Sequence, residues 1–359
     1  MKYVDEFRDR GLMRKLADAI QKAAYGGASY NFMEVCGTHT MNIFRYGLRD
    51  LLPDSIKLIS GPGCPVCVTP NDYLDKAIEI ANRKNVIITT FGDMLKVPGS
   101  HSSLEKERSE GREIRIVYST VDALGIAKKN PDKEVVFLGI GFETTAPTIA
   151  SSILTAEGEG IRNYSVLCGH KTMPEVMGVL VGDKKLKIDG FLLPGHVSAV
   201  TGSKPYLFLA KRYLKRCVIS GFEPMDILQS ILMLIEQNRP RIEIQYSRII
   251  SADGNVLARK AINRVFEKAS SNWRGIGVVE NSGLKIRKGF SGHDAEIKFR
   301  PKGHSTHERK GCICGDVLKG IKTPKDCRLF GKACVPEKPV GACMVSSEGT
   351  CAAYYKYGS

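Results

Sequence analysis

The sequence contains no apolar run that approaches the ~18 residues needed by a membrane-spanning helix. Its first 25 residues are charged and amphipathic, and they lack the apolar stretch of a signal peptide. We therefore expect a soluble, cytoplasmic protein without a membrane anchor. Disulfides are an unexpected use for cysteine in that compartment, where glutathione and thioredoxin keep thiols reduced. Clustered cysteines there are more often metal ligands or redox thiols.

Motifs for nucleotides and nucleic acids are missing or incomplete. No Walker A pattern occurs, and the run Gly139-Ile140-Gly141-Phe142-Glu143-Thr144 only begins like a dinucleotide fingerprint, because Thr144 replaces the third glycine. The formal net charge is +15, but no basic motif is interleaved with aromatic residues as in RNA-binding modules. We expect no nucleic-acid partner.

The positive charge is concentrated around the C-terminal cysteines. Between Lys285 and Lys338 there are 14 Lys and Arg against 6 Asp and Glu, a net of +8. A cationic surround stabilises thiolates and negatively charged clusters. The alternative is a solvated basic face that attracts an acidic partner protein.

Four of the 11 cysteines are spaced C-x14-C-x6-C-x16-C near the C-terminus: Cys312, Cys327, Cys334 and Cys351. Iron–sulfur clusters of the four-iron type need four thiolates, and a loop-rich segment with Gly and Pro can deliver them at irregular spacing. Zinc sites of four cysteines usually show paired C-x2–4-C hairpins, which these positions lack. The spacing favours a 4Fe–4S cluster over zinc or free thiols.

Two further cysteines, Cys314 and Cys343, lie in the same segment. A thiol pair beside a cluster can pass between dithiol and disulfide, which couples one-electron to two-electron chemistry. The alternative is a pair of small buried hydrophobic residues, which free cysteines often are.

Short apolar runs alternate with helical patterns after an N-terminal helical stretch over residues 2–24. The runs cover 31–35, 56–60, 85–91, 112–118, 134–140, 164–168, 188–194 and 216–220. Helix-period segments between them include 72–84, 121–130 and 205–215. This alternation predicts an α/β fold with parallel sheets and helices on their faces.

The length predicts two or three domains, and 43% hydrophobic residues suffice for real cores. The eight runs divide into two sets of four around the basic segment 128–133, which indicates two similar Rossmann-like lobes facing a cleft. We predict a first lobe over 28–130, a second over 131–238, and a smaller cluster-bearing domain from 1–27 together with 239–359.

Most runs end in a small or polar turn that opens a helix, and such turns share the carboxyl edge of a parallel sheet. One turn carries Cys64 and Cys67 as C-x-x-C, where a helix N-terminus lowers a thiol pKa; such a pair forms a disulfide or binds a soft metal. An inert structural turn is the alternative.

Another turn carries Cys36 and His39, which could share one metal, or the imidazole could tune the thiolate. His196 occupies an equivalent position, where helix capping is the alternative. Asp93 is either an N-cap or an acid near the metal.

Taken together, the motifs resemble those of the HypD family of hydrogenase-maturation proteins. They are VCGTHT (35–40), SGPGCPVCVTP (60–70), FGDMLKVPGS (91–100), GIGFETTAPT (139–148), LLPGHVSAVTG (192–202) and the cysteine quartet. They occur in order from about residue 30 to residue 351.

The resemblance implies a scaffold that, with the small chaperone HypC, carries the iron on which the Fe(CN)2CO unit of NiFe hydrogenase is built. HypF and HypE supply cyanide, and the hydrogenase large subunit receives the unit. Cys36 is the implied iron ligand, with His39 alongside, and Asp93 and His196 line the same cleft. Cys64 and Cys67 match the family's essential C-x-x-C, and the quartet matches its 4Fe–4S ligands.

These residues suggest a relay of electrons. It runs from the cluster through Cys314 and Cys343 to Cys64 and Cys67, and then to iron on Cys36. The alternative function is a cluster-linked thiol–disulfide oxidoreductase that acts on a protein disulfide.

Overall fold

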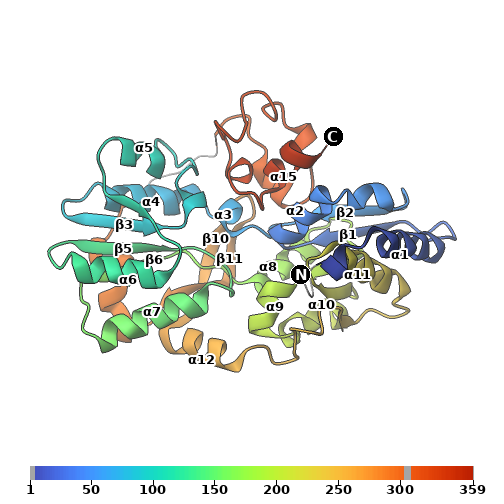
Figure 1. The fold of residues 1–359 in the computed structure, drawn as a ribbon, viewed down its shortest axis with the longest axis horizontal. Coiled ribbons are helices and arrows are strands. Elements are labelled where there is room, and N and C mark those ends of the chain that lie inside the picture. The colour runs from blue at the N-terminus through green and yellow to red at the C-terminus, as the bar shows by residue number, and fades with distance from the viewer. Residues whose placement is uncertain (1–4, 303–308, 359) are drawn as a thin grey trace.

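The computed structural model describes residues 5–302 and 309–358, and it consists of two α/β lobes with a cysteine-rich segment lying across them (Figure 1). Each lobe is built on a parallel sheet. Sheet A has the strand order β2-β1-β7-β8-β9, and sheet B has the order β4-β3-β5-β6. The predicted α/β class with two lobes is confirmed.

Sheet A is formed by β1 (Tyr30–Glu34), β2 (Ile56–Ser60), β7 (Gly190–Pro194), β8 (Arg216–Ser220) and β9 (Ile242–Ile244). Sheet B is formed by β3 (Val86–Thr90), β4 (Ile114–Ile116), β5 (Glu134–Gly139) and β6 (Tyr164–Cys168). Every pairing in both sheets is parallel. The central strands are buried on both faces, which explains why they read as continuous apolar runs.

Helices cover both sheets and follow most strands. Those of the first 130 residues are α1 (Arg10–Ala23), α2 (Gly37–Arg45), α3 (Pro65–Val68), α4 (Asn71–Ala81), α5 (Leu104–Ser109) and α6 (Thr120–Lys129). Those that follow are α7 (Ala146–Gly158), α8 (Met173–Gly182), α9 (Gly195–Thr201), α10 (Leu207–Lys211), α11 (Pro224–Glu236) and α12 (Val256–Val265).

The predicted division of the strands at residues 130 and 131 is wrong. Strands β3 and β5 lie on either side of that boundary and pair along residues 86–89 and 134–137. Strand β1 instead pairs with β7, which lies far along the chain. The chain therefore leaves the first lobe after β2, builds sheet B without interruption, and returns to complete sheet A.

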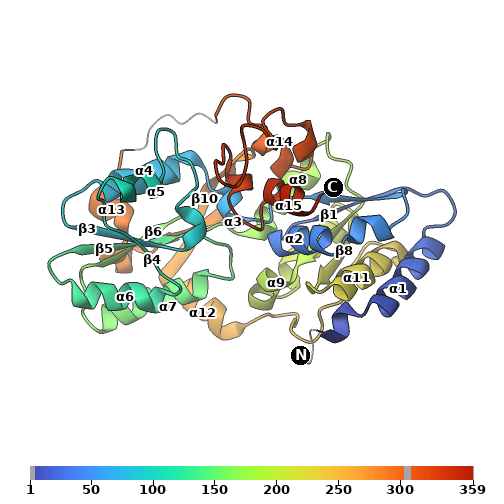
Figure 2. The same cartoon turned by 45° about the horizontal axis from the view of Figure 1, so that its top comes forward.

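The region after β9 does not form one domain with the N-terminus. Strands β10 (Phe266–Trp273) and β11 (Gly277–Ile286) form an antiparallel hairpin between the lobes. The cysteine-rich segment follows helix α13 (Ala295–Phe299), and it contains α14 (Cys314–Leu318), the 3-10 turn η7 (Ala342–Met344) and α15 (Thr350–Tyr357). Helix α15 packs on α2, with the rings of Phe44 and Tyr354 4.3 Å apart (Figure 2).

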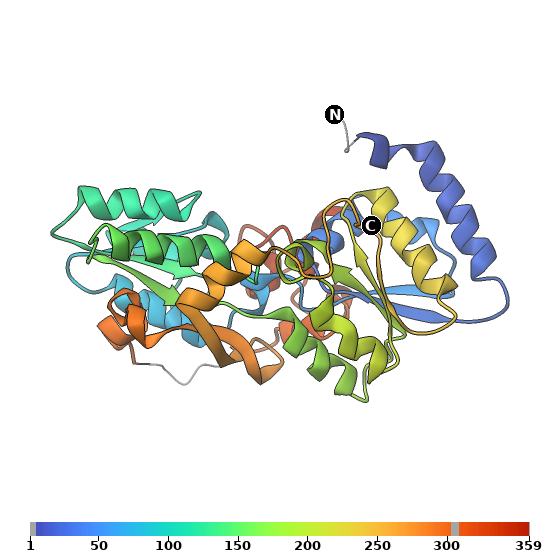
Figure 3. The ribbon, with the colours of Figure 1, turned by 90° about the horizontal axis from the view of Figure 1, so that it is seen from below.

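Helix α1 packs on α11 at the outer end of the lobe of sheet A, away from the cysteine-rich C-terminal segment (Figure 3). Asp9 caps it by accepting a hydrogen bond from the N–H of Leu12 at 2.8 Å. On the face of α1 that packs against this lobe, Ile20 is completely buried in the core. The expected cluster-bearing domain that included residues 1–27 is therefore not formed by their described part, and residues 1–4 lie outside the description.

None of the helices in residues 5–302 and 309–358 is long and apolar enough to cross a membrane.

Replacing Ile20 with Ala tests the docking of α1. Because Ile20 is fully buried, the loss of packing should lower the free energy of unfolding by about 2–4 kcal/mol in urea denaturation. Leu12→Ala on the same helix is the control, since Leu12 is 43% exposed and should cost much less. Equal effects of the two substitutions would contradict this packing.

Candidate functional site

The C-x-x-C turn contains a buried disulfide. Cys64 is the N-cap residue of α3, and its sulfur is bonded to that of Cys67, with the two Cα atoms 5.3 Å apart. Of the two uses left open by the sequence, the structure contains the disulfide. Gly63 brings this turn against the neighbouring one, because a Cβ added there would lie 2.2 Å from the backbone nitrogen of Cys36.

Cys36 occupies the equivalent place at the start of α2. Burial raises the pKa of its thiol to about 12, and the Glu348 carboxylate adds to this shift. The backbone N–H groups of Thr38 and His39 at the helix N-terminus oppose it. The thiol is therefore protonated at neutral pH, and binding a metal would require it to lose that proton.

His39 is buried with one ring nitrogen hydrogen-bonded and the other free. Its Nε2 lies 2.9 Å from the carbonyl oxygen of Gly221, so Nε2 carries the proton and donates. Its Nδ1 has no hydrogen-bond partner among the described residues. Burial lowers the pKa of His39 to about 4, so Nδ1 holds an available lone pair at neutral pH.

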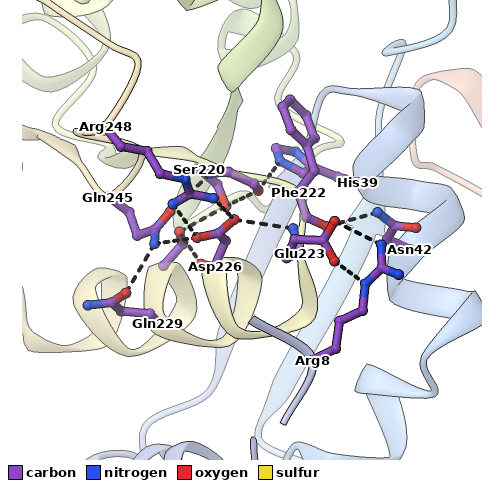
Figure 4. Close-up of polar contacts among 12 residues, drawn as sticks. Arg8, His39, Asn42, Ser220, Phe222, Glu223, Asp226, Gln229, Gln245 and Arg248 are labelled. Carbon is purple, nitrogen blue, oxygen red and sulfur yellow. Dashed lines mark hydrogen bonds and ion pairs between the residues drawn. The ribbon is translucent and has the colours of Figure 1, made fainter. Parts of the chain in front are cut away.

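A polar network that runs from buried Asp226 to exposed Arg248 supports the Gly221 carbonyl that fixes this tautomer (Figure 4). The N–H of Gly221 donates to Gln245 Oε1 at 3.0 Å, and Gln245 Nε2 donates to Asp226 Oδ1 at 2.9 Å. Asp226 is in turn held by both terminal nitrogens of Arg248, at 2.9 and 2.6 Å. These bonds hold the peptide of Gly221 in place, and so they orient the imidazole of His39.

Phe222 joins the two predicted histidines in a stack of three rings. Its ring centroid lies 3.8 Å from that of His196 and 4.9 Å from that of His39. The side-chain amide of Asn42 donates a hydrogen bond to the backbone carbonyl oxygen of Phe222 at 2.8 Å and so fixes the backbone of that residue. Sequence reasoning missed Phe222, although its position in the turn after β8 was a signal. His196 itself is exposed, and its pKa is lowered by partial burial.

Asp93 connects the lobe of sheet B to the cysteine-rich segment. It lies in the 3-10 turn Gly92–Met94, whose N-cap is Phe91, so Asp93 is not the predicted cap. Its Oδ2 instead accepts a hydrogen bond from Ser346 Oγ at 2.8 Å. Two residues further on, Glu348 accepts a hydrogen bond from Thr38 Oγ1 at 2.7 Å, which reaches the Cys36 turn of the first lobe.

All six cysteines of the C-terminal segment line one small pocket. They are Cys312, Cys314, Cys327, Cys334, Cys343 and Cys351, together with apolar side chains such as Leu329, Phe330 and Met344. No three or more His, Cys, Asp or Glu side chains in the described ranges are gathered to hold a single metal ion. Thiols around an apolar pocket nevertheless match the donor set that a four-iron cluster uses.

Four of these thiols form a row of contacts, in which Cys351 adjoins Cys343, Cys343 adjoins Cys314, and Cys314 adjoins Cys312. Cys314 Sγ lies 2.7 Å from Cys343 Sγ, and Cys314 also interacts with Cys312. Because Cys314 accepts from both, its pKa lies well below the ordinary value, while the pKa of Cys343 is raised well above it. The positive charge of Arg274 also favours the Cys314 thiolate.

The C-x-x-C disulfide lies against the segment that carries this thiol pair. Cys67 Sγ lies 3.9 Å from the carbonyl oxygen of Ala342, the residue before Cys343. Cys64, Cys67, Cys314 and Cys343 belong to one continuous buried cluster. The predicted thiol residues are therefore brought together, and Cys36 adjoins them through Gly63.

Comparison with known proteins gives consistent matches along the chain. The HypD family model, described as "Hydrogenase formation hypA family", matches residues 11–358. The chain is 48% identical to the hydrogenase maturation factor HypD of Azotobacter vinelandii, over all of this chain and 97% of that protein. It is 48% identical to the HypD of Rhodobacter capsulatus and 45% identical to that of Cupriavidus necator. Both alignments cover all of this chain, and they cover 98% and 97% of those proteins.

The protonation of His39 can be measured by NMR of protein labelled with ¹⁵N-histidine. Because its pKa is about 4, the ring should remain neutral with the proton on Nε2 from about pH 8 down to about pH 5. Replacing Gln245 with Leu removes the acceptor of the Gly221 N–H and should shift the Nε2 signal. A doubly protonated ring at about pH 6 in the unmodified protein would contradict this assignment.

Proposed function

The chain belongs to the HypD family and has a role in hydrogenase maturation, and we propose that it is the scaffold on which the Fe(CN)2CO unit of NiFe hydrogenase is assembled. The observation that carries this proposal is the contact between the three thiol centres. The Cys36 turn lies against the Cys64–Cys67 disulfide, and that disulfide lies against the segment of Cys343.

The substrate iron binds at the start of α2 in this proposal. Cys36 supplies a soft thiolate, which suits low-spin iron that carries cyanide and CO. The free Nδ1 of His39 supports a second role beside it, either as a ligand or as the acceptor of the proton that Cys36 releases. The ring of Phe222 stacks between His39 and His196, and Asp93 is bound through Ser346 to the segment whose Glu348 contacts Thr38 beside Cys36.

Cys312, Cys327, Cys334 and Cys351 hold a 4Fe–4S cluster in this proposal, since all four line one pocket with apolar walls. When bound, such a cluster supplies single electrons. The four thiolates are negatively charged. Arg274 is a cation close enough to this pocket to lower the pKa of Cys314, which also lines it.

Cys314 and Cys343 connect that pocket to the C-x-x-C turn by thiol–disulfide exchange. Cys343 gives its proton to the neighbouring Cys314 thiolate and attacks Cys67, and Cys64 leaves as a thiolate that takes up this proton; Cys314 then attacks Cys343 of the mixed disulfide, and Cys67 leaves as a thiolate. A thiol and a thiolate become a disulfide while another disulfide becomes a thiol and a thiolate, so two electrons and one proton change sides. The low pKa of Cys314 favours its thiolate for the second step.

The partners are those that the family resemblance implies. A HypC-type chaperone would share the iron, HypE with HypF upstream would supply cyanide, and the hydrogenase large subunit would receive the finished unit. The maturation role of the relatives supports partners within that machinery.

A second candidate is a cluster-linked oxidoreductase that reduces a disulfide of another protein. The Cys64–Cys67 disulfide beside a thiol pair favours it. It differs from the first function in its product, because the chain would then carry reducing equivalents and no iron with cyanide and CO.

Infrared spectroscopy of the chain purified with its small chaperone separates the two functions. We expect cyanide and CO stretching bands in the unmodified protein, and their loss in the double variant Cys314→Ser and Cys343→Ser. The iron–sulfur absorption of that variant should remain, since neither residue belongs to the quartet. Cys168→Ala, which removes a thiol outside the pocket, should keep the bands.

Two results would count against this account. Unchanged cyanide and CO bands in the double variant would exclude the relay. Protein that is loaded with iron and shows no such bands would favour the oxidoreductase.

A further inference from the structure

A second cavity, of about 690 Å³, lies between the two lobes on the side of α12, and no cysteine lines it. Its walls come from α8, α9, α10, α12 and the β10–β11 hairpin, which Figure 3 shows together on the near side of the molecule. This volume falls within the range of small-molecule sites. The iron and thiol chemistry proposed above makes no use of it.

The walls of the cavity are largely apolar and partly aromatic. Phe208 of α10 and Phe266 of β10 line it together with Val200, Ile262 and Leu284. Such a lining buries the flat body of a small organic molecule and excludes water from it.

Glu143 contributes a buried carboxyl group with one unused oxygen. The side chain lines the cavity although only 5% of the residue is exposed. Its Oε1 accepts a hydrogen bond from the N–H of Met173 at 3.0 Å. Its Oε2 has no partner within the described part of the chain. Buried polar atoms are nearly always paired, so this oxygen indicates a missing partner.

The protonation of Glu143 determines what that partner is. Burial raises the pKa of this carboxyl to about 8, so it is mainly the neutral acid at pH 7. The acid has a proton to donate, and its amide-bonded Oε1 is already an acceptor. The missing partner is therefore a hydrogen-bond acceptor.

The exposed rim of the cavity carries two arginines that form no salt bridge with a carboxylate of the described residues, although Arg259 lies near enough to Asp253 to help lower the pKa of that carboxyl. Lys268 is paired with Glu175, and Arg287 is paired with Glu267. Arg212 only lies over the ring of Tyr213, and Arg259 donates to a backbone carbonyl. No ion pair of either arginine is found in residues 5–302 and 309–358, so the rim can attract an anion.

We propose that this cavity binds a small aromatic molecule with an oxyanion group, held by Arg212 and Arg259 at the rim and by a hydrogen bond from Glu143 at the buried end. The aromatic body lies along Phe208 and Phe266. Because Glu143 follows β5 of sheet B while α9 and α10 cover sheet A, the ligand joins the two lobes. The site is independent of the proposed iron scaffold.

The experiment titrates the full-length protein with the fluorescent probe 7-hydroxycoumarin-3-carboxylate and follows its anisotropy. This probe has an aromatic body, a carboxylate at one end and a phenolic oxygen at the far end, which can accept the hydrogen bond from Glu143. We expect saturable binding of one probe per chain. The double variant Arg212→Gln and Arg259→Gln should raise the dissociation constant at least about tenfold, because both charged donors are lost.

Substitutions of Glu143 separate hydrogen bonding from charge. Glu143→Gln keeps a neutral donor and should bind the probe nearly as well, whereas Glu143→Leu should weaken binding several-fold. Arg239→Gln, an exposed arginine outside the cavity, and Cys36→Ser are the controls that should bind normally. The arginine variants change only exposed side chains, so they remain informative if Glu143→Leu fails to fold.

The absence of saturable binding, or binding that the arginine double variant leaves unchanged, would overturn the proposal. Neither result would affect the infrared test of the iron scaffold, because that test depends on different residues.

Discussion

The packing of residues 341–351 against the carboxyl ends of both sheets is the constraint on which the rest of the site depends. A Cβ added to Gly37 would lie 2.5 Å from the Cβ of Glu348, so the segment sits directly on the start of α2. On the other lobe, Ser346 holds Asp93. This single segment closes the distance between the C-terminal thiols and the motifs at the other end of the chain.

The fold could be predicted where local pattern decides structure. All eight apolar runs became parallel strands, and the central ones are continuously apolar because they are buried on both faces. Their distribution between the lobes could not be predicted, since the pairing of β1 with β7 joins segments far apart in the chain. The β10–β11 hairpin was missed because its sequence, as in Phe266–Trp273, is rich in small and charged residues.

The candidate site was predictable in its reactive residues and not in their supports. Cys36, Cys64 and Cys67 follow strands, and that position is readable from sequence. The tautomer of His39 depends on the backbone carbonyl of Gly221. Every residue has such a carbonyl, so the sequence does not indicate this contact. Glu143 was read only as part of an incomplete fingerprint and of the family motif at 139–148, and its unused oxygen is visible only when its burial is known.

The site keeps its groups neutral until they are used. Cys36 is a protonated thiol, and His39 is an uncharged base with a free nitrogen. Burying these groups in their neutral forms costs little free energy, whereas a buried thiolate would need a compensating positive charge. In the proposed scaffold, iron binding would supply that compensation and displace the proton, so metal loading would be coupled to deprotonation of Cys36.

The central claim is that Cys343 exchanges with the Cys64–Cys67 disulfide, and trapping the mixed disulfide tests it most directly. In the variant Cys64→Ser, Cys67 has no partner in its own turn but remains beside the segment of Cys343. Mass spectrometry of the mildly oxidised, alkylated protein should then detect a disulfide between Cys67 and Cys343. A free, alkylated Cys67, or a Cys67 bonded to a different cysteine, would contradict the relay.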